Sequence, residues 1–184
     1  SFYSHLNFNQ KDIQGIQMAR FGHALPVAKV SGIENAEFAH RDIGENIFHV
    51  GALGAGHTLK LINNFFGMTL ATAMSESFAM ADLAGIKRED LYNIMSAGPL
   101  HSMMMDLVKG NAVDGNHNSL GFSIGNAHKD LGYYVSMTES LNVNSAIATG
   151  TKASLGSAVN EGKGDLDVPD MVEHFAQTFA KTVK

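Results

Sequence analysis

The sequence of 184 residues contains no cysteine, no tryptophan and only three prolines. Without cysteine the chain has no disulfide framework and no thiolate zinc site, and cysteine use does not reveal its redox compartment. The scarcity of proline leaves long stretches free of helix breakers. Ten methionines supply flexible apolar side chains for a core. Together these features indicate a helix-rich protein.

Charge of either sign is also sparse. Charged residues make up 17% of the chain, and the net charge is −5 with an isoelectric point near 5.9. Since no basic cluster stands out, we expect no nucleic-acid partner. The nine histidines show neither His-x-His nor His-Glu-x-x-His spacing, so we expect no metal site.

Long hydrophobic runs are missing as well. The longest apolar stretch, residues 61–75, is interrupted by Asn63 and Asn64, and it is shorter than the roughly 18 residues of a membrane span. We therefore expect no membrane partner. The first residues lack the basic and apolar regions of a signal peptide, which predicts a cytoplasmic protein. Because the chain does not begin with methionine, residue 1 need not be the native N-terminus.

The periodicity of apolar residues predicts mostly helices. A short helix is expected over 12–20, an extended segment over 24–30 and a short strand over 46–50. A long helix, apolar nearly all round and ended by Gly85, is expected over 57–84. Further helices are expected over 89–97, 101–109, 123–141 and 145–161, with a loop over 111–119. Asp167 and Pro169 suit the start of a last helix.

The most informative stretch lies between residues 51 and 64. It reads Gly51-x2-Gly54-x-Gly56-x3-Lys60-x3-Asn64, which places three glycines at a turn before the long helix. Lys60 and Asn64 are four residues apart, so both project from one face of that helix. A lysine and an amide at the mouth of a glycine turn can hold and deprotonate a small hydroxy compound.

Two familiar glycine motifs do not fit this stretch. A P-loop requires Gly-Lys-Ser or Gly-Lys-Thr after its glycines, whereas Gly56 is followed by His57. The dinucleotide fingerprint requires Gly-x-Gly-x-x-Gly, a helix and a return strand, whereas the order here is Gly-x-x-Gly-x-Gly before one long helix.

The five spaced positions instead resemble the catalytic signature of the β-hydroxyacid dehydrogenases. A second family segment also matches, with Gly121-Phe122 followed by Lys129-Asp130-Leu131. The resemblance extends over about residues 46–175 and is closest to the 3-hydroxyisobutyrate dehydrogenase branch. It implies a mainly α fold, similar to the C-terminal domain of 6-phosphogluconate dehydrogenase and built on one long buried helix. It also implies two domains: a partial α/β remnant of a Rossmann domain over 1–50 and an all-α catalytic and dimerisation domain over 51–184.

The same resemblance implies an oxidoreductase that uses NAD or NADP to oxidise a small 3-hydroxy acid to its semialdehyde or keto acid. Lys60 is then the general acid and base, and Asn64 is the second catalytic residue. Cofactor binding is implied for Lys129, Gly54 and Gly56, and substrate binding for Ser31, Gly32, Asn64, Ser102 and Asp130. Phe122 is expected to pack rather than to contact substrate. The assembly is expected to be a homodimer or a homotetramer.

Each of these residues also has a purely structural interpretation. In that interpretation the aliphatic part of the Lys60 side chain only packs at the start of the helix, although the helix dipole disfavours a cation there. Asn64 is then a hydrogen-bonded amide in the core, and Lys129 is a solvated lysine on a helix. The glycines serve only to form a tight strand-to-helix connection. Because the chain has no dinucleotide glycine turn, we expect it to be only part of the full enzyme. The alternative function is a truncated, non-catalytic helical dimerisation module of the same family.

Overall fold

A computed structural model describes residues 13–20, 23–30, 46–51, 54–117 and 119–182 of the chain. It divides into two compact units, residues 1–63 and residues 64–184. The boundary between them falls inside one continuous helix, α2 (Ala55–Leu83). The two domains expected from the sequence, 1–50 and 51–184, stay a prediction.

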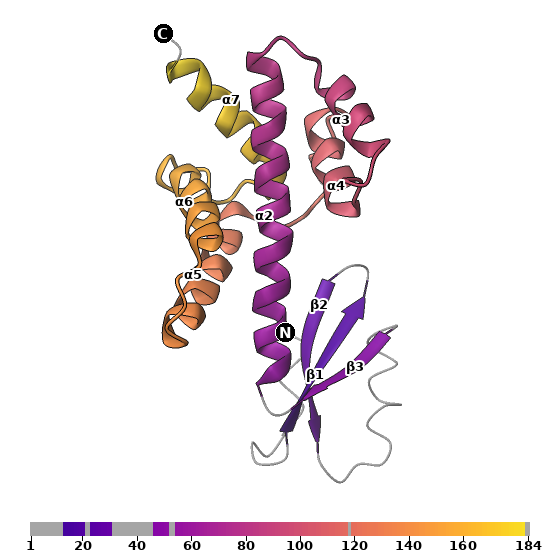
Figure 1. Cartoon of the computed structure of the whole chain (residues 1–184), viewed down its shortest axis with the longest axis vertical. Helices are drawn as coiled ribbons and strands as arrows, with labels where there is room; N and C mark the ends of the chain where they lie inside the picture. The colour runs from indigo at the N-terminus through magenta and orange to yellow at the C-terminus, as the bar shows by residue number, and fades with distance from the viewer. Residues whose placement is uncertain (1–12, 21–22, 31–45, 52–53, 118, 183–184) are drawn as a thin grey trace. The chain divides into compact units, whose positions relative to one another are not determined.

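The first unit contains a three-stranded antiparallel sheet. Its strands are β1 (Ile13–Arg20), β2 (His23–Val30) and β3 (Asn46–Gly51), in the order β2-β1-β3 (Figure 1). The extended segment over 24–30 and the strand over 46–50 are confirmed. The helix expected over 12–20 is wrong, because those residues form the central strand of the sheet and pair on both sides. This pairing is non-local, and a short periodic pattern does not detect it.

The long helix α2 is confirmed within two residues at its start and one at its end. Gly54 precedes it with φ +93°, and the N–H of Thr58 donates to the Gly54 carbonyl over 3.0 Å. At the other end Gly85 has φ +74°, and the N–H of Ile86 donates to the carbonyl of Ala81 over 2.8 Å. This six-to-one bond is a Schellman closure, which requires a residue such as glycine in the left-handed region. The helix is about 43 Å long.

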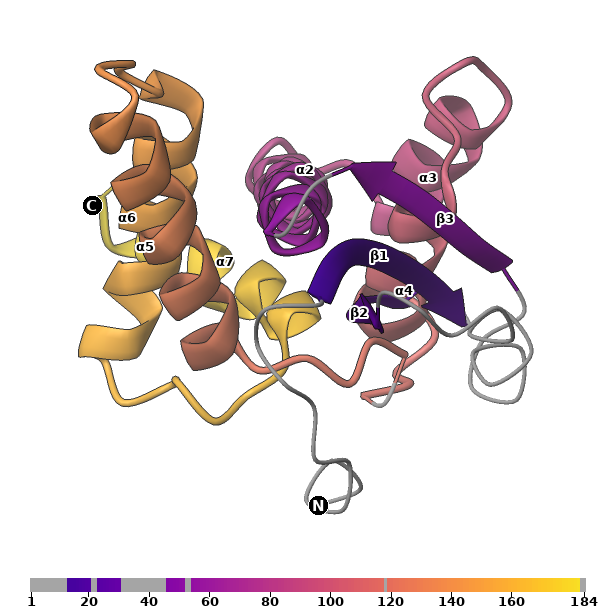
Figure 2. The ribbon, with the colours of Figure 1, turned by 90° about the horizontal axis from the view of Figure 1, so that it is seen from below.

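Among the described residues of the second unit, α2 is followed by five more helices and a short 3-10 turn (Figures 1 and 2). Ser102 and Ser123 cap α4 and α5, since their hydroxyl oxygens accept the N–H groups of Met105 and Asn126. Asp167 precedes the 3-10 turn and donates its N–H to the carboxylate of Asp170. The elements are α3 (Arg88–Ser96), α4 (Met103–Ala112), α5 (Ile124–Ser140), α6 (Ala146–Asn160), η2 (Val168–Asp170) and α7 (Met171–Thr182).

These helices confirm the expected ones with end shifts of a few residues. The largest shift is at α4, which continues to Ala112, so the first two residues of the loop expected over 111–119 are helical. The mainly α fold expected from the sequence is confirmed. No helix among the described ranges is long and apolar enough to cross a membrane.

One face of α2 forms the centre of the core. Met68, Ala71, Ser75 and Phe78 follow one another at intervals of three and four residues and are buried. The hydroxyl of Ser75 donates to the carbonyl of Ala71, so its burial leaves no unmet hydrogen bond. The other helices supply fully buried partners in the same cluster, among them Val108, Ile124, Leu131, Leu155 and Met171.

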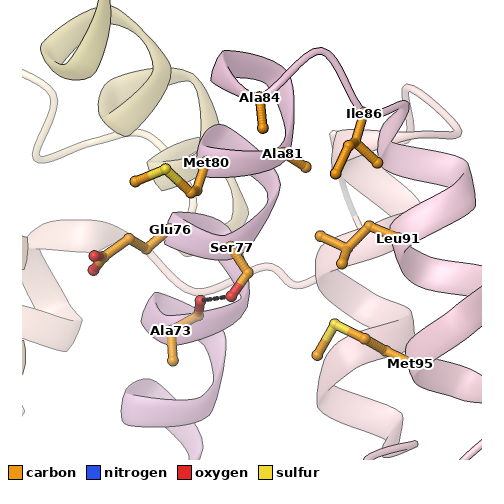
Figure 3. A pocket seen from close by; sticks show the side chains of 9 residues that line it. All are labelled: Ala73, Glu76, Ser77, Met80, Ala81, Ala84, Ile86, Leu91 and Met95. Carbon is orange, nitrogen blue, oxygen red and sulfur yellow. Dashed lines mark hydrogen bonds between the residues drawn. The ribbon is translucent and has the colours of Figure 1, made fainter.

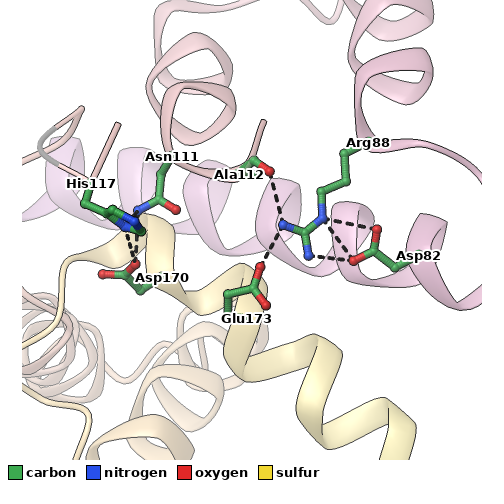
Figure 4. A network of polar contacts seen from close by, with 7 residues as sticks. All are labelled: Asp82, Arg88, Asn111, Ala112, His117, Asp170 and Glu173. Carbon is green, nitrogen blue, oxygen red and sulfur yellow. Dashed lines mark hydrogen bonds and ion pairs between the residues drawn. The ribbon is translucent and has the colours of Figure 1, made fainter. Parts of the chain in front are cut away.

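Arg88 joins four helices at the end of α2. Its guanidinium donates to both carboxylate oxygens of Asp82 and, through Nη1, to Glu173 on α7 over 2.7 Å and to the carbonyl of Ala112 over 3.1 Å (Figure 4). The hydrogen bond to Asp82 is the main reason that the pKa of Arg88 is raised. Because α3 begins at Arg88, this network fixes the start of α3 against α2, α4 and α7.

A neighbouring polar contact joins α4 to η2. Asn111 is buried and donates through Nδ2 to the Asp170 carboxylate over 3.0 Å. His117 lies beside the same carboxylate at 3.5 Å, as Figure 4 shows. A buried amide needs such a partner, and this one holds the turn before α7 in place.

His174 is the one buried histidine among the residues whose side chains the structure describes. Nε2 lies 2.8 Å from the hydroxyl oxygen of Ser157, and Nδ1 lies 3.2 Å from the ammonium of Lys163 and 3.3 Å from the carboxylate of Glu161. The Ser157 hydroxyl donates its hydrogen to Ser154. Nε2–H of His174 therefore donates to Ser157, and Nδ1 accepts from Lys163. Burial, followed by the Lys163 charge, lowers the pKa of His174, and Glu161 opposes this shift.

This lowered pKa predicts a loss of stability in mild acid. The unfolded histidine titrates near pH 6.5, and the folded one titrates lower. As the pH falls through about 6.5, the unfolded chain binds a proton that the folded chain does not, so unfolding becomes easier. We expect urea midpoints to fall more between pH 7.5 and pH 5.5 for the wild type than for His174→Gln. His57→Gln, at an exposed position of α2, is the matched control. Equal losses in the wild type and His174→Gln would contradict the assignment.

Candidate active site

The two family segments of the sequence meet at one hydrogen bond. Nδ2 of Asn64, on α2, donates to Oδ2 of Asp130, on α5, over 2.7 Å. The two residues are 66 positions apart in the chain. Asp130 is buried, with 6% of its surface exposed, and Asn64 is half-buried. The contact therefore joins the signature on α2 to the Lys129-Asp130-Leu131 segment.

The helical register of α5 explains why Asp130 is inside. Ile124, Ala127 and Leu131 form the buried face of α5, and Asp130 lies between the last two on that face. A carboxylate taken out of water requires strong hydrogen-bond donors. The Asn64 amide supplies one of them.

This bond also fixes the orientation of Asn64. A primary amide has two N–H donors on nitrogen and one carbonyl acceptor. Because Nδ2 is directed at Asp130, the carbonyl oxygen Oδ1 is directed away from it. The Asn64 side chain can thus present an acceptor of fixed direction to a hydroxyl group, without adding a charge.

The two candidate lysines lie next to these residues in the chain. Lys60 precedes Asn64 by one turn of α2 and is half-buried. Lys129 precedes Asp130 on α5, and consecutive helix residues point about 100° apart. Lys129 is accordingly exposed while Asp130 is buried, and its ammonium donates to the amide oxygen of Asn126 over 3.2 Å. Its side chain thus carries a positive charge at the surface of α5.

The glycine stretch has the expected strand-turn-helix geometry. Gly51 ends β3, Gly54 adopts the left-handed conformation, and Gly56 is buried in the first turn of α2. At φ +93° a side chain on residue 54 would be strained, although open space surrounds the Cβ position. The conformation, rather than crowding, therefore requires glycine at position 54.

The remaining candidates differ in how far the structure describes them. The hydroxyl of Ser102 is the N-cap of α4, and Phe122 packs against the core as expected. Ser31 and Gly32 lie outside the described residues. The sequence interpretation gave Asp130 as a substrate-binding candidate and did not predict its bond to Asn64. Only the inward register of Ala127, Asp130 and Leu131 indicated a buried carboxylate.

The fold is that of the β-hydroxyacid dehydrogenases of known structure. A 3-hydroxyisobutyrate dehydrogenase from Salmonella typhimurium superposes with a TM-score of 0.73 at 22% identity, over 89% of this chain and 60% of that one. The 3-hydroxyisobutyrate dehydrogenase of Mycobacterium tuberculosis, in a structure with L-serine, superposes with a TM-score of 0.65 at 20% identity, over 81% and 54%.

Curated relatives are also similar to this chain in sequence, at identities of 26% to 29%. Glyoxylate/succinic semialdehyde reductase 1 of Arabidopsis thaliana is 26% identical over 71% of this chain and 45% of its own length. 2-(Hydroxymethyl)glutarate dehydrogenase of Eubacterium barkeri is 29% identical over 49% and 30%. The cytokine-like nuclear factor N-PAC of Anopheles gambiae is 27% identical over 73% and 24%. The chain thus spans less than half the length of these relatives.

The family model described as NAD-binding of NADP-dependent 3-hydroxyisobutyrate dehydrogenase matches residues 54–175. This match includes Lys60, Asn64 and Asp130. The chain belongs to this family of NAD(P)-dependent β-hydroxyacid dehydrogenases, as the spaced glycines, Lys60 and Asn64 indicated. The family implies a nicotinamide cofactor.

The bond between Asn64 and Asp130 predicts that the same substitution lowers the unfolding free energy more at position 64 than at position 63. Asn64→Asp replaces the donor by a second carboxylate beside a buried one, so the two cannot both ionise at low cost. We expect a loss of about 2 kcal/mol or more in unfolding free energy at pH 8. Asn63→Asp, the same change at the exposed neighbouring position, is the control. Similar losses for both variants in urea unfolding would show that the bond contributes little.

Proposed function

We propose that the chain supplies the helical part of an NAD(P)-dependent oxidoreductase that oxidises a small 3-hydroxy acid, similar to 3-hydroxyisobutyrate, to its semialdehyde or keto acid. The observation that carries this proposal is the 2.7 Å bond between Asn64 and Asp130. It connects the two segments that resemble the family's site, and it orients an amide one helical turn from Lys60. A scaffold without chemistry does not require a buried carboxylate at this place, because burying one costs stability.

In this proposal Lys60 moves the proton. It takes the proton from the substrate hydroxyl while a hydride leaves the same carbon, and it returns the proton in the reverse direction. The nicotinamide cofactor supplies the acceptor for that hydride. Asn64 holds the substrate hydroxyl or carboxylate through the amide groups that Asp130 leaves available.

The residues on α5 fit the anionic reactants. The Lys129 ammonium donates to a neutral amide, so its charge suits the substrate carboxylate, and the resemblance to the family also makes Lys129 a candidate for cofactor binding. Asp130 contributes by holding Asn64. Gly54 and Gly56 allow the backbone before and within the first turn of α2 to approach the cofactor. Ser31, Gly32 and Ser102 are the further substrate-binding candidates.

The names of the relatives support the substrate class. One is a semialdehyde reductase and another a dehydrogenase of a hydroxymethyl acid. The Mycobacterium tuberculosis structure contains L-serine, whose hydroxyl lies on the carbon β to its carboxylate. 2-(Hydroxymethyl)glutarate carries a hydroxyl at the same position, whereas glyoxylate and succinic semialdehyde are small acids with an aldehyde group. A small acid with an alcohol or an aldehyde group is the feature that these compounds share.

Replacement of the proposed acid and base tests the reaction directly. Small 3-hydroxy acids are assayed with NAD and with NADP, and Lys60→Ala is expected to lower turnover by about 10²- to 10⁴-fold while the helical circular dichroism is unchanged. Lys87→Ala, at an exposed lysine after α2, should retain full turnover. Unchanged turnover in Lys60→Ala would rule out its assigned role.

A second candidate function is a non-catalytic helical dimerisation module of the same family. One relative is named as a nuclear factor rather than as an enzyme, and this observation favours the alternative.

Cofactor binding separates the two functions. A ligand present at 100 times its dissociation constant stabilises the folded chain by about 2.7 kcal/mol, so NAD or NADP should raise the melting temperature by several degrees if the chain binds it. AMP at the same concentration is a control for non-specific effects of a nucleotide. A melting temperature insensitive to both dinucleotides would favour the dimerisation module.

A further inference from the structure

A pair of stacked aromatic rings lies directly beside the bond between Asn64 and Asp130. The ring centroids of Phe65 on α2 and Tyr134 on α5 are 4.4 Å apart, and the ring planes are 9° from parallel. Phe65 follows Asn64 in the chain, and Tyr134 follows Asp130 by one turn of α5. Both rings are half-buried and pack against the core cluster. The same turns of α2 and α5 are therefore joined twice, once by a hydrogen bond and once by a stack.

The hydrogen bond alone leaves the Asn64 amide some freedom. The side chains of Asn64 and Asp130 each have two rotatable bonds. The two helices can therefore slide or separate slightly while Nδ2 stays within reach of the carboxylate. Each such movement turns the amide plane, and with it the direction of Oδ1. An acceptor that has to meet a substrate hydroxyl depends on direction as well as on distance.

The stack restricts this freedom. Two ring faces in contact cannot approach further, and separating them loses the attraction of an aromatic pair. Because Asn64 and Phe65 are joined by one rigid peptide group, a shift of the Phe65 backbone also displaces Asn64. The stack thus fixes the spacing between α2 and α5 at the residue next to the hydrogen bond.

A third contact attaches the next turn of α2 to α6. The hydroxyl oxygens of Thr69 and Thr151 are 3.2 Å apart. The Thr151 hydroxyl donates its hydrogen to the carbonyl of Ile147 over 3.0 Å, so Thr69 is the donor between the two threonines. Along this part of α2, the helix is attached to α5 at Asn64 and Phe65, and to α6 one turn further on.

The opposite side of α2 borders open space over part of its length. Ala73 and Met80 lie on the side of the helix opposite to Asn64, and they line one wall of an open groove of about 590 Å³. Figure 3 shows Leu91 and Met95 of α3 on the other wall. A helix moves more easily toward open space than into a packed neighbour, so the position of α2 depends on its contacts with α5 and α6.

We propose that Phe65 and Tyr134 are positioning residues for the Asn64 amide. Their stack holds α2 at the distance from α5 at which Nδ2 of Asn64 reaches Asp130 and Oδ1 keeps one direction. Both residues act through Asn64 rather than on the substrate. The effect on turnover rests on the proposed function, in which Asn64 holds the substrate, whereas the effect on the amide itself does not.

The exchange of the Asn64 side-chain amide protons with water tests the proposal without any substrate. In nuclear magnetic resonance spectra of the whole chain, these signals are assigned by their absence from Asn64→Asp. Tyr134→Leu removes one ring and Phe65→Leu the other, and in each the protons should exchange at least about fivefold faster because the hydrogen bond opens more often. Tyr134→Phe keeps the ring and should exchange at the wild-type rate. Unchanged exchange in both leucine variants, or equal acceleration in Tyr134→Phe, would overturn the proposal.

The second aromatic stack of the protein supplies a matched control. Phe175 and Phe179 on α7 have ring centroids 5.8 Å apart, and Phe179 is half-buried like Tyr134. Phe179→Leu removes a comparable aromatic contact from the core and should leave the exchange of the Asn64 amide unchanged. Acceleration equal to that in Tyr134→Leu would show a general loosening of the core and refute the positioning role.

Turnover of a 3-hydroxy acid is the second measurement. Tyr134→Leu should lower kcat at least about tenfold, because small misplacements of a site group are costly, and Tyr134→Phe should retain the wild-type kcat. Faster amide exchange with unchanged turnover would overturn the role of the stack in the reaction. A wild-type chain that turns over no 3-hydroxy acid would reject the proposed function, and the amide exchange would still decide whether the stack holds Asn64.

Discussion

Phe78, Ala71 and Ser75 have no exposed surface, and they hold one face of α2 against the helices that follow it in the chain. This contact is the constraint on which the second unit depends. A helix of 29 residues cannot turn about its axis once several turns of it are packed. Every other position of α2 then has a fixed direction, so the buried stripe determines which side chains reach the α5 side chain Asp130 and which remain at the surface.

The candidate site follows from this constraint. Asn64 is four residues before Met68, so it continues the buried stripe of α2 by one turn, and Lys60 continues it by one more. The stripe changes along its length from apolar residues at Phe78 to an amide and then an ammonium group. Asp130 lies within the buried face of α5, beside buried Leu131. The packing that holds the helices together thus ends in a polar contact without a change in helical register.

The sequence contains most of the local information but little of the long-range information. Helix periodicity, the stop signal Gly85 and the start signals Asp167 and Pro169 identified the helices of the second unit, because these signals act within a few residues. The strand β1 was missed because it is stabilised by two partners elsewhere in the chain, and the isolated pattern of Ile13 and Ile16 fits a helix equally well. The family signature identified Asn64 and Asp130 as separate candidates. Their hydrogen bond depends on how α2 and α5 pack, which no single segment encodes.

The exposed face of α2 is a second feature that the sequence alone did not predict. Apolar residues around the whole helix predicted burial, yet Phe66, Leu70 and Met80 are exposed while Phe78 and its neighbours are buried. Both sets of residues recur at helical spacing, so composition and periodicity do not distinguish them. The difference is that the buried stripe contacts the helices that follow it in the chain. Which face of α2 becomes buried is thus decided by helices that lie far from it in the sequence, and no pattern within α2 itself encodes that choice.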